Sequence, residues 1–530
     1  MRHLRILLRI AFLLAIGFTL QIAVAYQANS QKKQDPALAR SYVAIAQKLL
    51  AAGDSANALE KLNLAVQADS RNADAYLLLG LTEFQRGETS KSIEHYRRAL
   101  QLQPDSYPGH YNLGLAYLRE HKLPESRAEL EQALKLDPNQ ADAAYDLGIV
   151  MLELGHPAIA LDHLTRAKRL NPERPDVFFN IVRAELEAGH ISEARDDAQA
   201  GARRFGADFR WSASIGELFL NESQPADAAI YLRKASSVRP GDAENRRQLA
   251  VAYLESHQPK QVLDLITEPK TVDDYYLRGS SYYMEHRFSE AAQESEHALV
   301  LAPADPRVLV LRTRVLQRAG EHRAALELAH KAASVAPNWD EPYYVAGVSL
   351  YFIQRYTEAG QELARAVELN PKSVRALFLE AVALANQDKQ NEAEVYLRRA
   401  ITLQPNNARF HCHLGILLAR ENLFARAEES FRRAIKLAPN YGLAHYELGK
   451  VLVHAAQWRE AAQELSLAIA QDPRLSGAYY QLARVYGKLG DTEKSKRMLA
   501  DFERLHQQEA NDSQALDDDT KNETESSEAP

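Results

Sequence analysis

The sequence predicts an all-α solenoid of about fourteen stacked helix pairs. Prolines recur at intervals of 34 residues over long parts of the chain, and a fixed period of this size is typical of a stacked repeat array. The prolines concerned are Pro104, Pro138, Pro172, Pro303, Pro337, Pro371, Pro405, Pro439 and Pro473. Small residues recur in the same register. Glycine and proline are scarce, at 23 and 21 of 530 residues, which favours long helices over turn-rich β structure.

The repeat has an internal order that defines its unit. With the recurring proline at position 32, thirteen units have 34 residues and one has 29. Position 8 is glycine or another small or β-branched residue, positions 20 and 27 are mostly alanine, and position 24 is usually large. The units begin at residues 39, 73, 107, 141, 175, 209, 243, 272, 306, 340, 374, 408, 442 and 476.

This order predicts an antiparallel helix pair in each unit. Apolar residues at positions 4, 7 and 11 lie on one helical stripe, and those at positions 20, 24 and 27 lie on another. Small residues at positions 8 and 20 allow the two helices to approach closely. The proline ends the second helix because it lacks an amide donor and restricts the residue before it. One pair cannot bury both of its faces, so neighbouring pairs must stack and share a core.

Two segments make a family resemblance specific: YNLGLAYLREHKLPESRAELEQALKLDPN at 111–139 and HLGILLARENLFARAEESFRRAIKLAPN at 413–440. Both resemble the unit of the tetratricopeptide repeat (TPR) family, and the in-phase pattern extends over residues 39–509. The resemblance implies an all-α, right-handed superhelix. It also implies protein–protein contact as the general activity, and no particular reaction.

The N-terminal segment 1–25 predicts a secretory signal peptide. Three arginines in the first nine residues precede an apolar run over 10–24, and a small-x-small site predicts cleavage between Ala25 and Tyr26. The alternative is an uncleaved membrane anchor, although the apolar run is shorter than the roughly 20 residues that span a bilayer. Both alternatives place the repeats outside the cytoplasm, in a periplasmic or secreted protein.

The array itself is expected to follow a linker at 26–38. Units 1–7 occupy 39–271 and units 8–14 occupy 272–509. The seventh unit, 243–271, is short, with its second helix at about 260–267, and it either acts as a hinge or stacks like the other units. The last unit has a polar outer side that suits a C-terminal cap.

The C-terminal end of the chain is expected to lack a fold. The last 22 residues, 509–530, hold eight acidic side chains, one lysine and no aromatic residue. They predict a disordered acidic tail over 510–530. This tail is either an interaction segment or a solubilising end. Without the three arginines of the signal segment the formal charge of −7 becomes −10, and residues 509–530 hold −7 of it. The remaining −3 on the body gives no excess of positive charge that would indicate nucleic-acid binding.

The sequence contains no recognisable catalytic machinery. It has no phosphate-binding loop, zinc-protease motif or nucleophile elbow, so no enzymatic activity, cofactor or metal site is expected. A single cysteine, Cys412, excludes an internal disulfide framework. Its neighbours His411 and His413 point about 200° apart on a helix and cannot share one metal ion. Cys412 falls at position 5, which predicts a thiol facing the groove.

The candidate binding residues lie on the first helices, which in the family line the concave groove. Position 5 is aromatic in eight units, and tyrosine can bury its ring while its hydroxyl forms hydrogen bonds. The alternative is that these rings simply pack between neighbouring first helices. Cations accompany the rings in the C-terminal units. The candidates are Tyr111, Tyr145, Phe179, Tyr276, Tyr344, Phe378, Tyr446 and Tyr480, with Arg409, Lys450 and Arg484.

These features together predict an exported, non-enzymatic scaffold that binds protein or peptide partners in its groove. The mixed aromatic and basic groove suits an acidic peptide. The alternative is an envelope factor for polysaccharide or cell-wall assembly that binds glycan along the tyrosines, an idea that rests on fold-level analogy. Contact with a membrane is expected only through an uncleaved N-terminal segment.

Overall fold

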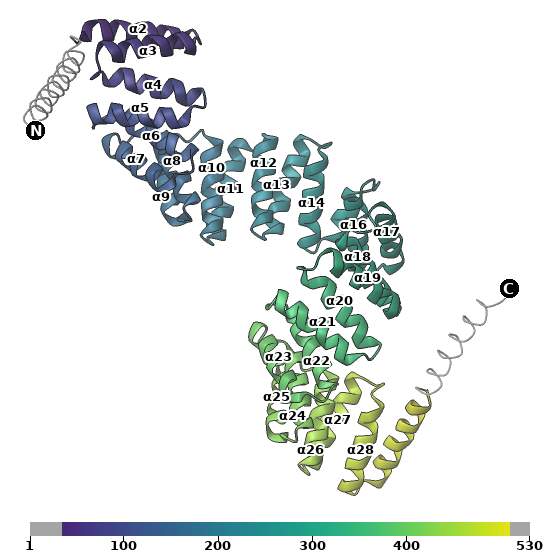
Figure 1. The fold of residues 1–530 in the computed structure, drawn as a ribbon. Coiled ribbons are helices and arrows are strands. Elements are labelled where there is room, and N and C mark those ends of the chain that lie inside the picture. The colour runs from purple at the N-terminus through teal and green to yellow at the C-terminus, as the bar shows by residue number, and fades with distance from the viewer. Residues whose placement is uncertain (1–33, 509–530) are drawn as a thin grey trace, which may run out of the picture. The chain divides into compact units, whose positions relative to one another are not determined.

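A computed structural model describes residues 34–508, and these residues form helices joined by short turns, with no strand among them (Figure 1). The predicted signal segment 1–25, with its cleavage site at Ala25 and Tyr26, and the predicted tail 510–530 lie outside the described residues. The described part divides into two compact units, the first ending at His257 and the second beginning at Gln258.

The first unit contains thirteen helices: α2 (Pro36–Ala51), α3 (Ser55–Ala68), α4 (Ala73–Gln85), α5 (Thr89–Leu102), α6 (Tyr107–Arg119), α7 (Leu123–Leu136), α8 (Ala141–Glu153), α9 (Pro157–Leu170), α10 (Pro175–Glu187), α11 (Ile191–Phe205), α12 (Phe209–Asn221), α13 (Pro225–Val238) and α14 (Ala243–Glu255).

The second unit contains α15 (Pro259–Leu265), α16 (Val272–Met284), α17 (Phe288–Leu301), α18 (Pro306–Arg318), α19 (His322–Val335), α20 (Asp340–Phe352), α21 (Tyr356–Leu369), α22 (Val374–Ala385), α23 (Gln390–Leu403), α24 (Ala408–Arg420), α25 (Phe424–Leu437), α26 (Gly442–His454), α27 (Trp458–Gln471) and α28 (Ser476–Leu489). A last helix follows over 492–508.

Consecutive helices pack in pairs, and each pair packs on the next. In the second unit α20 packs on α21, α21 on α22, and α22 on α23, and the same order continues to α28. The first helices of neighbouring pairs also touch, as α20 and α22 do, or α24 and α26. The predicted fold class, an all-α solenoid of about fourteen helix pairs, is confirmed.

One backbone feature marks every repeat. Position 15, in the turn between the two helices of a unit, has a positive φ in all fourteen units. Six of these turns use glycine, as at Gly87 with φ 82°, and eight use another residue, as at Asn422 with φ 61°. Because a left-handed residue ends the first helix and reverses the chain, the turn fixes where each second helix begins.

The small residue at position 8 has the predicted role. A Cβ atom added at Gly415 would lie 2.5 Å from Cε1 of Phe431, the large residue at position 24 of the same unit. At Gly80 the same atom would lie 2.7 Å from the ring of Tyr96. Both rings are fully buried. The glycine therefore makes room for the large residue of the second helix, which fills the centre of the pair.

In several repeats the side chain at position 4 contacts the carbonyl group of the proline that ends the preceding unit. The Tyr343 hydroxyl donates a hydrogen bond to the carbonyl oxygen of Pro337 (3.2 Å), and the Nε2 atom of His445 lies 2.9 Å from that of Pro439. The proline that ends the preceding helix thus also supplies a carbonyl group that is free to accept. The proline and the aromatic or histidine side chain six residues later therefore connect two consecutive repeats.

The shortened unit lies where the chain passes from the first compact unit to the second. Its second helix, α15, has seven residues, begins one residue before the predicted start at 260 and ends two residues before the predicted end at 267. Thr271 and Asp274 then form a capping box that begins α16. No described helix combines the length and the apolar character that crossing a membrane requires.

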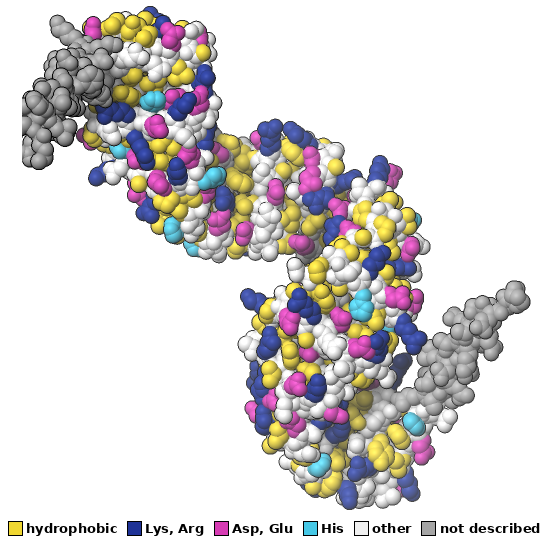
Figure 2. Space-filling view, viewed as in Figure 1, with side chains coloured by type: hydrophobic (Ala, Val, Ile, Leu, Met, Phe, Trp, Pro, Cys, Tyr) yellow, Lys and Arg dark blue, Asp and Glu magenta, His cyan; other side chains and the backbone are white. Residues whose placement is uncertain are grey.

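Charged side chains of both signs alternate over the visible face of the repeats (Figure 2). Many of them pair within one helix, as Arg355 does with Glu358 and Arg398 with Glu394. Exposed pairs of this kind add little to stability, but they cancel the long-range field of this face.

Candidate functional site

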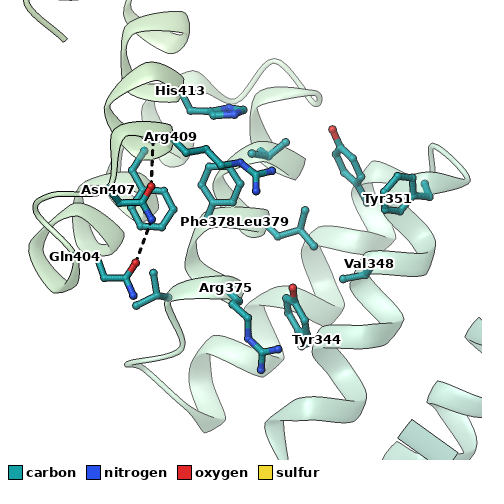
Figure 3. Close-up of a pocket in the computed structure, with 14 residues that line it drawn as sticks. Tyr344, Val348, Tyr351, Arg375, Phe378, Leu379, Gln404, Asn407, Arg409 and His413 are labelled. Atoms are coloured by element: carbon teal, nitrogen blue, oxygen red, sulfur yellow. Dashed lines mark hydrogen bonds between the residues drawn. The ribbon is translucent and has the colours of Figure 1, made fainter. Parts of the chain in front are cut away.

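A cavity of about 510 Å³ opens on the first helices of three consecutive repeats in the second unit (Figure 3). Helices α20, α22 and α24 form its walls, and the turn before α24 closes one edge. None of its described lining residues is Asp or Glu, so its formal charges are positive. The lining residues are Tyr344, Val348, Tyr351, Phe352, Val374, Arg375, Phe378, Leu379, Val382, Gln404, Asn407, Arg409, Phe410 and His413.

Phe378 forms the floor of this cavity. Its ring stacks on Phe410 with 5.1 Å between centroids and meets His413 edge-on at 4.9 Å. Only 7% of Phe378 is exposed, because it belongs to the buried core that α22 shares with α24. The floor is therefore rigid, and a partner would meet a preformed apolar surface.

Two arginines lie above the aromatic rings of the cavity. The Cζ atom of Arg409 lies 4.5 Å from the Phe378 ring centroid, and that of Arg375 lies 4.8 Å from the Tyr344 ring centroid. Arg375 also pairs with Glu341 at 2.8 Å. The guanidinium of Arg409 makes no hydrogen bond or ion pair with another residue in the range 34–508. Its donors are thus available to a carboxylate, for which the guanidinium plane is well shaped.

His413 is neutral at pH 7. Its pKa falls to about 4 because the ring is buried and because Arg409 and Arg420 lie nearby. A neutral imidazole offers one donor and one acceptor to a ligand. The charge of the cavity therefore comes from its arginines.

Two smaller cavities continue the recess along the first helices. The first, of about 200 Å³, shares Tyr351, Val382 and His413 with the main cavity. The second, of about 290 Å³, shares Ile416 and Arg420 with the first and extends to α26. The three cavities form one groove across α20, α22, α24 and α26.

The structure brings some of the predicted site residues of the second unit together. Tyr344, Phe378 and Arg409 line the main cavity. Lys450 lines the third cavity and pairs there with Glu447 at 2.8 Å.

Four further candidates of the second unit, Tyr276, Tyr446, Tyr480 and Arg484, do not line these cavities. Tyr446 is half-buried, with Nζ of Lys450 5.2 Å from its ring centroid. Tyr480 is 42% exposed and contacts Phe502 as well as Arg484 of its own helix. Tyr276 lies apart on α16, with Arg307 of the next repeat above its ring at 5.3 Å.

The predicted site residues of the first unit have internal partners. The Tyr111 hydroxyl donates to the Asp146 carboxylate at 2.8 Å, and the hydroxyl of Tyr145 accepts a hydrogen bond from Asn180 at 3.1 Å. Burial raises the pKa of Asp146 to about 6. Phe179 is half-buried on α10. Tyr111 and Tyr145 thus link one first helix to the next, which favours packing over partner binding at these two positions.

The sequence pattern missed several lining residues. Tyr351 and Phe352 stand at positions 12 and 13 of their unit, where a pair of aromatic residues could have drawn attention. Phe352 is 61% exposed and stacks on His322 at 4.7 Å. Gln404 and Asn407 lie in the turn before α24, where no position-based expectation applied.

The expectation that Cys412 faces the groove is wrong. The side chain is completely buried, and burial raises the pKa of its thiol to about 12. It packs in the core between α24 and its neighbours because position 5 turns inward in this unit. Among residues 34–508, no group of three or more His, Cys, Asp or Glu side chains is placed to hold a metal ion.

Solved structures with a similar fold include a chain of the APC/C hetero-tetramer Cut9-Hcn1, with 14% identity, 88% of this chain and 98% of that chain covered, and a TM-score of 0.44. Yeast Tom70 has 17% identity, coverage of 82% and 92%, and a TM-score of 0.33. YrrB, described as a TPR protein with an unusual peptide-binding site, has 22% identity, coverage of 35% and 95%, and a TM-score of 0.31. No curated protein matches the sequence.

Models of one repeat family match both compact units. A TPR repeat model matches residues 80–120, and tetratricopeptide repeat models match 111–175, 179–243, 344–408, 412–476 and 476–501. These matches cover more than half of the chain and confirm the resemblance seen in the sequence. The chain belongs to the tetratricopeptide repeat family.

Proposed function

We propose that this chain is a non-enzymatic scaffold that binds an extended peptide segment of a partner protein across α20, α22 and α24. The observation that carries the proposal is the main cavity, an apolar recess with an unpaired arginine at its mouth. Its volume of about 510 Å³ lies within the range of preformed ligand pockets. Its depth suits one or two apolar side chains of a peptide.

The two arginines at the mouth of the cavity determine which peptides it would favour. A side chain that enters the recess passes Arg375 and Arg409, whose guanidinium groups lie above Tyr344 and Phe378. A carboxylate next to the inserted side chain would pair with Arg409 without displacing an existing partner. The favoured partner is therefore a segment in which an apolar residue is followed or preceded by acidic residues.

Export is part of the proposal. It is supported by the charged and apolar pattern of residues 1–25 and by the small-x-small site before Tyr26. The partner would then be another protein outside the cytoplasm. Alkaline phosphatase fused after residue 40 tests this part, because the enzyme is active only when the first 40 residues direct its export.

Selection from a displayed library of twelve-residue peptides on residues 26–530 tests the binding site. We expect enrichment of peptides with one large apolar residue beside acidic residues. A fluorescent copy of an enriched peptide should lose at least tenfold in affinity when Arg375→Glu and Arg409→Glu are combined.

The matched control combines Arg399→Glu with Arg433→Glu. These exposed arginines lie on the second helices of the same two repeats, so the control changes the net charge equally. Equal loss in both double variants would contradict the site. Absence of enriched peptides, together with a change in tyrosine fluorescence on adding oligosaccharides, would favour the glycan alternative instead.

A further inference from the structure

The acidic end of the same chain matches the chemistry of the main cavity. Residues 509–530 contain one large apolar side chain, Leu516, and three consecutive carboxylates follow it at 517–519. The cavity offers an apolar floor at Phe378 and two arginines at its mouth. The segment 516–519 thus has the same composition that the rim of the cavity selects.

We propose that the segment 516–519 occupies the main cavity of its own chain and competes with partner peptides. Leu516 inserts against Phe378, and the aspartates that follow pair with Arg409 and Arg375. This inference rests on the proposed function, since it assigns a second, internal occupant to the same site. The chain would then bind a partner only when the partner displaces its C-terminal segment.

The last helix delivers the tail to the correct edge of the groove. In each repeat the second helix runs antiparallel to the first and ends beside the start of the next first helix. At the cavity this edge is the turn that follows α23, where Gln404 and Asn407 contribute to the lining. The helix over 492–508 is the second helix of the last repeat, so it ends on the same edge of the second unit.

The length of the connection also fits. Seven residues lie between 508 and Leu516, and the eight Cα–Cα steps from 508 to Leu516 span up to about 27 Å when extended. First helices of neighbouring repeats are in contact from α24 through α26 to α28, and packed helices lie about 8–10 Å apart. Three such steps, about 24–30 Å, lead from the helix over 492–508 through α28 and α26 to α24. Leu516 therefore reaches the α24 side of the cavity, where the Phe378 ring packs on Phe410 and His413, and the aspartates reach on toward α22.

The groove cations nearer to the tail differ from Arg409. Arg484 on α28 donates a hydrogen bond to Gln481 and lines none of the three cavities, and Lys450 on α26 pairs with Glu447. Position 2 of a unit carries Arg409 in α24 and Arg375 in α22, but Leu443 in α26 and Gly477 in α28. The next arginine at position 2 is Arg307, which already pairs with Asp273 and Asp305. The unpaired guanidinium of Arg409 is therefore the first suitable site that the tail meets.

Because the segment 516–519 is part of the same chain, even weak binding to the cavity would compete with an external peptide. Attachment through a linker of this length gives an effective concentration in the millimolar range. If the free segment binds with a dissociation constant near 1 mM, a tether at about 10 mM weakens an external peptide about tenfold. Neutralising the three aspartates should remove this effect.

Photo-crosslinking of the full chain tests where the tail lies. A benzoylphenylalanine placed at Ala515 should crosslink within one chain to α20, α22 or α24, and the crosslinks should disappear in the Arg375→Glu, Arg409→Glu double variant. The same group at Ala529 is the control and should not crosslink to these helices. Crosslinks that are equal for both positions, or that form only between two chains, would overturn the proposal.

Competition supplies a second measurement that leaves the repeats unchanged. The probe is a fluorescein-labelled peptide of residues 511–522. It should bind the full chain about tenfold more tightly when Asp517, Asp518 and Asp519 are all replaced by asparagine. The matched control replaces Glu523, Glu525 and Glu528 by glutamine, removes the same charge, and should change the affinity less than twofold.

The outcomes separate the two proposals. Peptides from the library that bind at α22 and α24 while the tail shows neither crosslinks nor competition would refute only the internal occupant. Equal affinity of the probe for both triple variants would also refute it. Crosslinks at α24, with no library peptide binding there even when Asp517, Asp518 and Asp519 are all asparagine, would refute the scaffold function and retain the tail contact.

Discussion

The guanidinium of Arg409 lies over the ring of Phe378, with 4.5 Å between Cζ and the ring centroid, although the two residues belong to neighbouring repeats. The ring covers one face of the guanidinium, while its N–H groups remain unpaired among the described residues. Stacking thus holds the cation in place without neutralising it. This relationship makes the cavity a site for an anion rather than only a hydrophobic recess.

Replacing Arg409 separates its charge from its shape. Arg409→Gln should weaken an acidic library peptide about tenfold, because one charge-assisted pair is lost. It should also reduce the dependence of the affinity on salt. Arg409→Lys keeps the charge but loses the planar stack, and we expect an intermediate affinity with the salt dependence retained. Anisotropy titrations at 50 and 300 mM NaCl measure both effects. Binding by Arg409→Lys equal to that of the unaltered chain would contradict a role for stacking, and equal loss in the two variants would contradict a role for the charge.

The aromatic residues at position 5 do not all have the same role, and their stability effects should differ. Phe378 is 7% exposed within the core, so Phe378→Ala should lower the free energy of unfolding by about 3 kcal/mol. Tyr480 is 42% exposed, so Tyr480→Ala should cost less than about 1 kcal/mol. Urea unfolding followed by circular dichroism measures both. Similar losses would mean that exposure does not distinguish groove from core at this position.

His413 should make the second unit less stable in acid. Its pKa in the fold is about 4, below the ordinary value of 6.5, because of burial and then of Arg409 and Arg420. Between these two values the unfolded chain binds more protons than the folded chain, so the free energy of unfolding falls as the pH is lowered. The loss between pH 7 and pH 4.5 should be on the order of 2 kcal/mol.

The variant His413→Gln checks this assignment. It removes the titrating group, so the difference in stability between pH 7 and pH 4.5 should shrink relative to the unaltered chain. His411 is a suitable control, because it lies two residues away with its Nε2 atom 2.9 Å from the carbonyl oxygen of Pro405. An unchanged pH dependence in His413→Gln would show that another group is responsible.

The regular part of this fold could be predicted from the sequence, because it depends on spacing. Gly415 and Phe431 are a fixed interval apart, and that interval alone predicts their contact. The cavity depends on features that spacing does not encode. Cys412 at position 5 of α24 is buried in the core, whereas Tyr480 at position 5 of α28, the last first helix described, is 42% exposed. Phe352 lines the cavity from the end of α20, and Asn407 lines it from the turn before α24. The spacing of the core positions predicts neither contact.

Glu380 should destabilise the fold as the pH rises. Burial raises its pKa to about 8 from an ordinary value of 4.5, with Lys389 opposing the shift and Glu392 adding to it. Its Oε2 atom has no hydrogen-bond partner and lies over Gly360, where an added Cβ atom would be 3.6 Å away. Between pH 4.5 and 8 the folded chain holds a proton that the unfolded chain releases, so the free energy of unfolding decreases with pH.

Glu380→Gln isolates this effect. The amide has the shape of the protonated acid and does not titrate, so the variant should exceed the unaltered chain in stability by about 4 kcal/mol at pH 8 and match it at pH 4.5. Comparison of the two chains at each pH cancels the contribution of all other groups. A variant that is less stable at both values would show that the carboxylate is ionised and has a favourable role.

The turn at position 15 offers a test that involves no binding. Ala456 has φ 56° there, whereas Gly53 has φ 78° at the same position of the first repeat. A left-handed conformation costs an L-residue about 1 kcal/mol, and glycine adopts it freely. Ala456→Gly should therefore raise the free energy of unfolding by about 0.5–1 kcal/mol, and Gly53→Ala should lower it by a similar amount.

Measuring both Ala456→Gly and Gly53→Ala separates the cost of the left-handed conformation from the effect of glycine on the unfolded chain. No atom lies within 4 Å of a Cβ added at Gly53, so Gly53→Ala tests backbone conformation without a steric clash. If flexibility of the unfolded chain dominated, Ala456→Gly would be destabilising and Gly53→Ala stabilising. Opposite signs in the expected order, measured by urea unfolding of the full chain, would establish that each repeat turn needs a left-handed residue.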